Sequence, residues 1–415
     1  MIQALQAGGA FAMPRRISAL AVALLALVCV SAPAQQPARP VAASPDVLDV
    51  QGGQIRVVTV ATGLVHPWSI ALLPADRSML VAERNGQVRL IENGMLAAEP
   101  VWSAEGVAAG SELKWLTLHP SFVSNRLVYL SYPKAGERGT TLAVARGRFD
   151  GRKLNDVREI FVADAWETGG NLGGKILFGP DGTLYVTVGD RDRLCCTGTE
   201  DNSLRMKAQD LSNHVGKTLR IRDDGTVPPD NPFVGRAGAK PEIFTYGHRN
   251  GYGLGFHPET GELWQAEIGP MGGDEVNILK PGHNYGWPLV SMGRNYTGSL
   301  VSDKPYFRDG MDNARMFWVP SISPSSLLFY TGERFPQWRN NMLVGSLNGQ
   351  SVQRVAFGQP SQAERREPVL RALNVRIRDV QQTRDGYLYV ATELRFQGAE
   401  ADGTILRLEP VGTTK

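Results

Sequence analysis

Arginines occur in two short segments that lie far apart in the chain. The stretch YGHRN places Arg249 beside Asn250, and VRIRD places Arg376 and Arg378 two residues apart. Alternate side chains of a β-strand lie on one face, so Arg376 and Arg378 are predicted to point the same way. A guanidinium binds carboxylates through two parallel hydrogen bonds, so these arginines would suit a small polyanionic ligand. Each arginine alone would also fit a surface ion pair.

A second candidate site is the turn GPMGGDE at residues 269–275. It offers backbone carbonyls at Gly269 and Pro270 and the adjacent carboxylates of Asp274 and Glu275. Hard oxygen ligands of this kind suit Ca²⁺, although the spacing is not that of an EF-hand loop. The alternative is an acidic turn on a solvated face.

Residues 169–176, GGNLGGKI, come close to the phosphate-binding loop G-x-x-x-x-G-K-[ST]. A phosphate loop needs a Ser or Thr after the lysine to hold Mg²⁺, and Ile176 stands there instead. The glycines should also open a helix, but Pro180 and a β-rich run follow. A nucleotide site is therefore not expected, and the glycines need another explanation.

The elements that carry these residues are predicted to be short strands rather than helices. A turn signal followed by a Leu-aromatic-Val type of strand recurs six times, at residues 77–91, 125–132, 181–190, 260–269, 340–355 and 385–394. Repeated short strands of this kind are typical of a β-propeller. We predict an all-β protein, a six-bladed β-propeller that forms one domain over residues 48–415. A large β-sandwich is the less favoured alternative.

The composition excludes some classes of partner. The 415 residues carry 44 basic and 41 acidic side chains, a net charge of +3. This balance gives no indication of nucleic-acid binding or of stable membrane insertion.

The N-terminus is predicted to be an export signal. Arg15 and Arg16 precede an apolar run at 17–30, and a small-residue cleavage site follows at Ala34. We expect a signal peptide at 1–34, a Pro/Ala-rich disordered leader at 35–47, and a periplasmic or secreted protein.

Taken together, nine segments resemble one family in their order along nearly the whole mature chain. The segments are GLVHPWSIALLPADRSMLVAERNGQVRLI, GPDGTLYVTVGDR, AQDLSNHVGKTLRI, DGTVPPDNPF, YGHRN, GPMGGDEVN, GHNYGWP, PSSLLFYTG and VRIRDV. With these segments the chain resembles the soluble quinoprotein aldose sugar dehydrogenases, also called the glucose/sorbosone dehydrogenase family.

This resemblance implies a six-bladed propeller and oxidation of aldoses to lactones with pyrroloquinoline quinone (PQQ) and Ca²⁺. Arg249 and Asn250 would contact the quinone, and Arg376 and Arg378 its carboxylates and rim. The carbonyls of Gly269 and Pro270 would bind the catalytic Ca²⁺. Glu275 and the Tyr285 carbonyl would form a second, structural Ca²⁺ site. The partners would be a sugar substrate and an electron acceptor, either a quinone or a cytochrome.

The chain departs from the family pattern at the expected proton acceptor. Asn171 stands where the family has its catalytic histidine, and an amide cannot act as a general base. Asn348, in GSLNG, replaces a lysine that contacts the quinone, and Gly110 replaces a glutamine. His66 and His248 are the candidate substitutes for the base.

The only cysteines left after signal cleavage are the adjacent Cys195 and Cys196. In an oxidising compartment they can pair only with each other or remain free. By resemblance they lie in the loop that closes over the cofactor, where a vicinal disulfide would form a stiff ring. Buried free thiols are the alternative.

Two other functions remain open from the sequence. One is a binding propeller, or pseudoenzyme, that keeps the fold and Ca²⁺ but has little turnover. The other is a Ca²⁺-dependent lactonase-like hydrolase. The arginines favour the dehydrogenase and the binding protein, because a hydrolase has no need of a tricarboxylate site.

Overall fold

The computed structural model describes residues 46–412, except for 75–77, 193–200, 359–363 and 395–400. The predicted signal peptide, the leader up to residue 45, and both Cys195 and Cys196 lie outside these residues. Every described element belongs to one compact unit of the chain. None of the helices in the described residues is long and apolar enough to cross a membrane.

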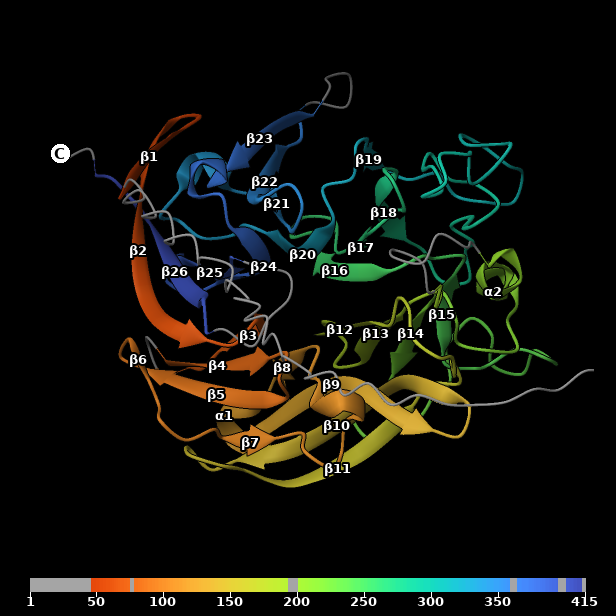
Figure 1. Ribbon diagram of the computed structural model, residues 1–415, viewed down its shortest axis with the longest axis horizontal. Helices are drawn as coiled ribbons and strands as arrows, with labels where there is room; N and C mark the ends of the chain where they lie inside the picture. The colour runs from red at the N-terminus through yellow and green to blue at the C-terminus, as the bar shows by residue number, and fades with distance from the viewer. Residues whose placement is uncertain (1–45, 75–77, 193–200, 359–363, 395–400, 413–415) are drawn as a thin grey trace, which may run out of the picture. The chain divides into compact units, whose positions relative to one another are not determined.

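The described strands form six antiparallel sheets, which we number as blades 1–6 (Figure 1). Blade 1 contains β3 (Pro67–Leu72), β4 (Ser78–Glu83), β5 (Gln87–Glu92), β6 (Met95–Leu96) and β7 (Trp102–Ser103). Blade 2 contains β8 (Leu116–Leu118), β9 (Leu127–Gly136), β10 (Gly139–Phe149) and β11 (Leu154–Val162). Blade 3 contains β12 (Gly173–Phe178), β13 (Leu184–Val188), β14 (Lys217–Ile221) and β15 (Ile243–Tyr246). Blades 4 and 5 contain β16 (Gly251–Phe256), β17 (Leu263–Glu267), β18 (Asp274–Leu279) and β19 (Met316–Trp318); and β20 (Pro324–Phe329), β21 (Met342–Ser346), β22 (Ser351–Ala356) and β23 (Arg365–Val369). Blade 6 contains β24 (Arg376–Gln382), β25 (Leu388–Glu393) and β26 (Gly403–Pro410), together with β2 (Gly53–Leu64) and β1 (Val47–Val50).

Blade 6 joins the two ends of the domain. The N-terminal strand β2 pairs antiparallel with the C-terminal strand β26, from Ile55 opposite Pro410 to Leu64 opposite Gly403. This pairing closes the ring, so every blade packs between two other blades. The all-β fold and the six blades predicted from the sequence are confirmed.

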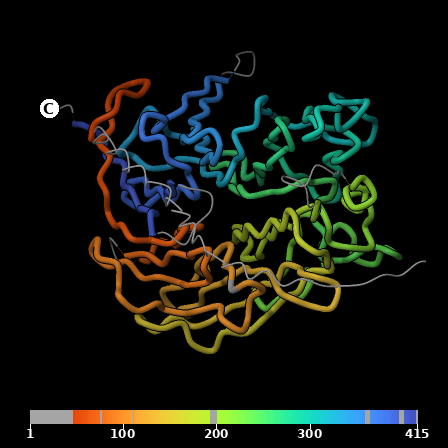
Figure 2. Tube along the Cα trace, viewed as in Figure 1, coloured from red at the N-terminus to blue at the C-terminus, as the bar shows by residue number. Residues whose placement is uncertain are grey.

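The core lies between the blades, because each sheet packs against a neighbour on both faces. The strand β13, LYVTV, is therefore buried at every position rather than at every second one. The innermost strands β3, β8, β12, β16, β20 and β24 contact one another in turn around the ring. Figure 2 shows the chain passing through the blades in sequence order.

Helices are few and short in the described part of the chain. They are α1 (Phe122–Asn125), α2 (Asn202–Met206) and the 3-10 turns η1 (Ala109–Ser111), η2 (Lys207–Gln209), η3 (Pro336–Trp338) and η4 (Arg371–Leu373).

Candidate functional site

Five of the residues singled out from the sequence lie where the innermost strands begin. Asn171 precedes β12, Arg249 and Asn250 precede β16, and Arg376 and Arg378 open β24. Asn171 and Asn250 are in contact, with Asn250 Nδ2 3.4 Å from Asn171 Oδ1. These positions gather the candidate site at one end of the propeller.

Asn171 is held by a buried carboxylate. Its Nδ2 donates to Asp190 Oδ1 at 2.9 Å, and the backbone N–H of Asp192 donates to the same oxygen at 3.1 Å. Asp190 Oδ2 is buried and has no hydrogen-bond partner in the described part of the chain. Burial raises the pKa of Asp190, although the charge of Arg249 opposes this shift. Asp190 is thus a titratable group directly behind the position expected for the base.

The glycines of residues 169–174 allow two backbone segments to approach closely. Gly170 has φ +82°, and a Cβ there would lie 2.3 Å from the carbonyl oxygen of Asp192. Gly173 has φ +71°, and its Cβ would lie 2.8 Å from Gly189 N. A side chain at either position would push Asn171 away from Asp190.

Arg249 contacts the turn proposed from the sequence to bind Ca²⁺. Its Nη1 donates to the carbonyls of Ile268 (2.8 Å) and Gly269 (3.0 Å), and its backbone N–H donates to Glu267 Oε2 (2.7 Å). The guanidinium lies 5.4 Å from the Trp287 ring centroid. The Nε atom is buried and has no acceptor among the described residues.

Arg376 and Arg378 share one buried carboxylate, Glu393 at the end of β25. Arg376 Nε lies 2.9 Å and Arg378 Nη2 2.6 Å from Glu393 Oε1, and His66 Nδ1 lies 2.9 Å from Oε2. Burial alone would raise the pKa of Glu393, but Arg378, His66 and Arg376 lower it. Arg376 Nη1 also donates to Asn348 Oδ1 at 3.1 Å. Arg378 Nε has no acceptor within the residues described.

Two glutamates, Glu267 (buried) and Glu275 (half-buried), face each other below the 269–273 turn. Glu267 and Glu275 are directly opposite partners in the β17–β18 ladder, and Asn277 Nδ2 donates to both, at 2.7 and 3.1 Å. Burial, with the charges of Glu267 and Asp274 adding to it, raises the pKa of Glu275 to about 8. Like charges directly opposite in a sheet repel, so a cation would relieve this pair. A cavity of about 160 Å³ adjoins them, lined by Glu275, Tyr285, Val290, Met292, Pro305, Tyr306, Asp312, Asn313, Ala314 and Phe317.

Asp274 organises the turn beside this pair. Its carboxylate accepts hydrogen bonds from Gly269 N (2.8 Å), Ile322 N (2.7 Å), Ser323 N (2.9 Å) and Ser321 Oγ (2.9 Å). Within the described residues, no three His, Cys, Asp or Glu side chains group as metal ligands, so a cation here would rely on backbone carbonyls.

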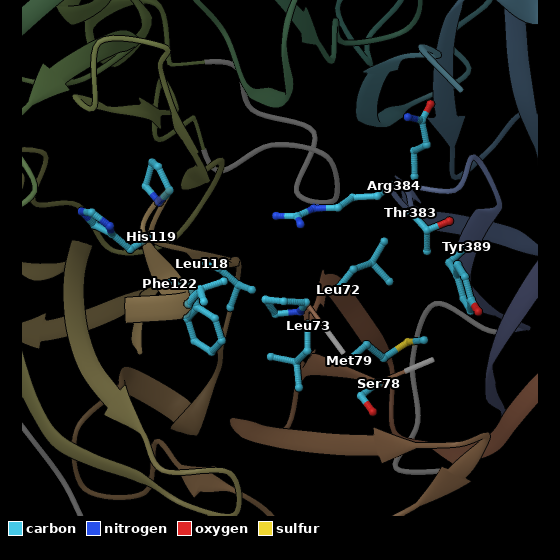
Figure 3. A pocket seen from close by; sticks show the side chains of 14 residues that line it. Leu72, Leu73, Ser78, Met79, Leu118, His119, Phe122, Thr383, Arg384 and Tyr389 are labelled. Carbon is cyan, nitrogen blue, oxygen red and sulfur yellow. The ribbon is translucent and has the colours of Figure 1, made fainter. Parts of the chain in front are cut away.

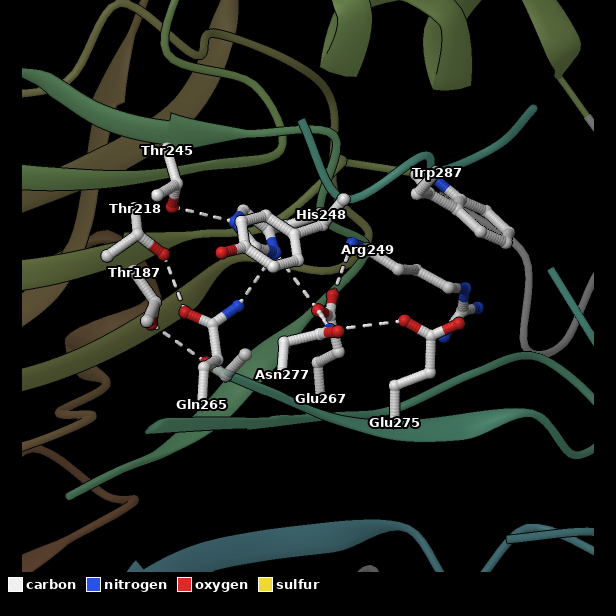
Figure 4. A network of polar contacts seen from close by, with 12 residues as sticks. Thr187, Thr218, Thr245, His248, Arg249, Gln265, Glu267, Glu275, Asn277 and Trp287 are labelled. Carbon is white, nitrogen blue, oxygen red and sulfur yellow. Dashed lines mark hydrogen bonds and ion pairs between the residues drawn. The ribbon is translucent and has the colours of Figure 1, made fainter. Parts of the chain in front are cut away.

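His248, one substitute for the base suggested by the sequence, is fixed inside a polar network (Figure 4). Its Nε2 lies 2.8 Å from Thr245 Oγ1, and its Nδ1 lies 3.0 Å from Glu267 Oε1. The ring is buried and stacks on Tyr285 at 4.9 Å. With both nitrogens engaged, His248 holds Glu267 in place. His66, the other substitute, is bound to Glu393.

An open cleft of about 300 Å³ lies beside Asn171. It is lined by Ala109, Gly110, Glu112, Lys114, Pro133, Thr140, Gly169, Gly170, Leu172 and Arg191. Another cavity, of about 200 Å³, lies where β3, β8 and β24 end, among residues such as Leu72, Leu118 and Thr383 (Figure 3). It is therefore remote from the residues that open the inner strands.

Asp190 and Glu393 are the functional candidates that the sequence analysis missed. Each comes at or just after the end of a buried strand, β13 or β25. A polar residue at that place was the available signal, but single acidic residues after strands are also common in turns.

Comparison with known proteins identifies the family. A model of the family described as Glucose / Sorbosone dehydrogenase matches residues 64–407. Aldose sugar dehydrogenase YliI of Escherichia coli is 34% identical over 86% of this chain and 93% of its own, and quinoprotein glucose dehydrogenase B of Acinetobacter calcoaceticus is 25% identical over 83% and 87%. The PQQ-bound aldose sugar dehydrogenase of Streptomyces coelicolor superposes with a TM-score of 0.68 at 27% identity, covering 86% of this chain and 97% of that one. The chain therefore belongs to the glucose/sorbosone dehydrogenase family.

Proposed function

We propose that this protein oxidises aldose sugars to lactones with PQQ and Ca²⁺ at the end of the propeller where the inner strands begin. The observation that carries the proposal is the pair Arg376 and Arg378, fixed by Glu393, with Arg378 Nε lacking an acceptor among the described residues. The printed names of relatives, one a quinoprotein and one a PQQ-bound enzyme, support it.

The donor set fits a tricarboxylate quinone. Arg249 and Arg378 each have a buried Nε without a partner in the described chain, and leaving such donors unpaired is costly. Carboxylate and carbonyl oxygens of a bound quinone would supply the missing acceptors. When bound, PQQ would supply an acceptor for the hydride from C1 of the sugar.

Two groups of oxygen atoms would hold Ca²⁺. The carbonyls of Gly269 and Pro270 would hold the catalytic ion, with Asp274 fixing the turn, and Arg249 Nη1, 3.0 Å from Gly269 O, would have to share or release that carbonyl. The carboxylates of Glu275 and Glu267, together with the Tyr285 carbonyl, would hold the structural ion.

Asn171 and Asp190 determine how the hydroxyl proton leaves the sugar. The amide of Asn171 can orient a hydroxyl but cannot accept its proton, so turnover should be slow. The nearest titratable group is Asp190, 2.9 Å from Asn171 Nδ2. The cleft beside Asn171 would admit the sugar.

The test is reconstitution of purified apoprotein with PQQ and Ca²⁺. We expect a bound-quinone absorption spectrum that an aldose panel bleaches slowly. Arg378→Met should weaken quinone binding, whereas Arg365→Met, at an exposed position on β23, should not. A wild-type protein that binds no quinone at micromolar concentrations would refute the proposal.

A binding propeller with little turnover is the second candidate, favoured by the amides at Asn171 and Asn348. Tight quinone binding without bleaching by any aldose would select it.

We also propose export to the periplasm or medium. The mass of the exported protein should correspond to a chain that begins after Ala34, and an uncleaved N-terminus would contradict this.

A further inference from the structure

Three aromatic side chains from different blades meet at the centre of the ring. Trp68 on β3 packs edge-on against Trp115 at 5.8 Å and against Tyr252 on β16 at 6.0 Å, and Trp115 lies 5.2 Å from Tyr252. The strands β3 and β16 are not neighbours in the ring, so the contact between Trp68 and Tyr252 spans its interior. We call these three residues the aromatic floor.

Three cationic side chains lie against the aromatic floor. Arg378 lies 4.2 Å and Lys114 Nζ 4.5 Å from the centroid of the same ring, Trp68. Lys175 Nζ lies 5.5 Å from the Trp115 ring. Lys114, which precedes β8 of blade 2, and Arg378, in blade 6, therefore both contact Trp68.

Arg378 pairs with Glu393 and Lys114 with Glu112, but three other donor atoms in this region have no acceptor among the described residues. Trp68 Nε1, Trp115 Nε1 and Arg378 Nε are all buried without an acceptor in the described part of the chain. The nearby carboxylate of Asp379 is already engaged by Ile70 N at 2.9 Å and Val380 N at 3.0 Å. A bound anion would supply acceptors here.

Lys114 is held in place much better than a surface lysine. It is only 8% exposed, and a Cβ on Gly174 would lie 3.2 Å from Lys114 Cβ, which shows how closely the side chain packs. Its Nζ contacts Glu112 Oε2 at 2.9 Å. Lys114 also lines the open cleft that is lined by Gly170 and Leu172, the chain neighbours of Asn171, so a ligand in that cleft can reach it. Little side-chain entropy would be lost on binding.

We propose that Lys114 binds a carboxylate of the quinone together with Arg378, and so supplies the positive charge that Asn348 does not. This inference rests on the proposed function, because it names a further residue that positions the same cofactor. The amide of Asn348 is uncharged, and its Oδ1 accepts a hydrogen bond from Arg376. A cation in place of the lysine that the family has at this position must therefore come from another blade.

The experiment titrates PQQ into Ca²⁺-loaded apoprotein and follows quenching of tryptophan fluorescence and heat of binding. Lys114→Met should weaken binding by about 10–100-fold, the range for a hydrogen bond to a charged group. Lys114→Arg should retain most of the affinity. The matched control Lys134→Met removes an exposed lysine on β9 that pairs with Glu159, and it should bind as the wild type does.

Two further measurements isolate charge from packing. Asn348→Lys added to Lys114→Met should restore affinity, because it returns a cation beside Arg376. The trimethyl ester of PQQ should bind wild type and Lys114→Met equally, because it has no carboxylate charge.

The outcomes separate this inference from the proposed function. Wild type and Lys114→Met binding PQQ equally would overturn the role of Lys114 and leave the dehydrogenase proposal intact. Wild type that binds no PQQ would overturn both. If Lys114→Met fails to fold, the test uses Lys114→Arg and compares the affinity of the wild-type protein for PQQ with its affinity for the trimethyl ester. Equal affinities for PQQ and the ester would count against the inference.

Discussion

Replacing Asn171 with histidine should supply a general base at the position proposed for it. In both side chains the first nitrogen is separated from Cβ by one atom. The Nδ1–H of the new imidazole can therefore take the place of Asn171 Nδ2, which donates to Asp190 Oδ1 at 2.9 Å. That bond fixes the tautomer and leaves Nε2 as the proton acceptor.

The expected gain is about 100-fold in the rate of quinone reduction by an aldose. A positioned general base is worth about 10²–10⁴-fold, and a factor of 100 corresponds to about 2.7 kcal/mol in the barrier. We expect the lower end of this range for two reasons. The Asn250 Nδ2 contact to Asn171 Oδ1, at 3.4 Å, is lost, and Asn348 still supplies no cation.

The assay is single-turnover bleaching of bound PQQ in stopped flow, as a function of pH. Asn171→His should show a rate that rises with pH through an inflection near the histidine pKa of about 6.5. Asn171→Gln keeps an amide and should show no gain. Asp190→Asn in the histidine variant should abolish most of the gain, because the imidazole then loses the carboxylate that orients it.

A correctly folded Asn171→His variant with wild-type rates would refute this reasoning. If wild type itself turns over quickly, and His66→Asn removes that activity, then the base is His66 and the alignment of residue 171 with the family histidine is wrong.

The remaining predictions concern the ions, the arginines and the cysteines. In chelator, the folded-state pKa of Glu275, about 8, lies above the unfolded value of about 4.5, so stability should fall between pH 5 and 8. Glu275→Gln should reduce that slope in melting temperature and leave a part below about pH 6 from Asp274, whose pKa burial raises to about 6; an unchanged slope would contradict the role of Glu275. Ca²⁺ at about 100 times its Kd should add roughly 2.7 kcal/mol to the free energy of unfolding, and a melting temperature insensitive to chelator would contradict a coupled site. Arg249→Ala and Arg376→Ala should each weaken PQQ binding by about 10–100-fold, measured by titration with Arg365→Ala as control. Alkylation of exported protein without reductant should label neither Cys195 nor Cys196, and two labels in the intact mass would exclude a disulfide.

The sequence was informative about the blades because strand patterns are local. The unit at 385–394 and the one at 181–190 each predicted a real strand, β25 and β13. The closure of the ring could not be predicted in this way, because β2 and β26 are more than 300 residues apart in the sequence. Neither strand has a sequence pattern that identifies the strand with which it pairs.

The candidate site could be predicted in part, where residues of the same type lie close together in the sequence. Arg376 and Arg378 both reach Glu393, as expected of side chains that point the same way, although the β24–β25 pairing is irregular between Ile377 and Asp379. Glu393 was not found, because its role depends on the β24–β25 register that sets it opposite Arg376. Lys114 was missed for a related reason: whether a lysine is buried depends on the packing of blades 2 and 3, not on its own neighbours in sequence.

Unsatisfied buried charge gives the strongest physical argument that this end of the propeller binds something. A group kept only for stability should have its polar atoms paired, since each buried unpaired atom costs about 1–3 kcal/mol. Asp190 Oδ2, Arg249 Nε and Arg378 Nε all lack partners among the described residues, and all three belong to segments at the same end of the inner strands. His248, by contrast, is equally buried but has both nitrogens bonded, as expected of a residue that only supports its neighbours. Unpaired buried atoms also occur elsewhere, at Arg89 Nε and Trp338 Nε1 for example, so it is the gathering of Arg249, Arg378 and Asp190 at one end, and not the lack of partners alone, that favours a ligand there.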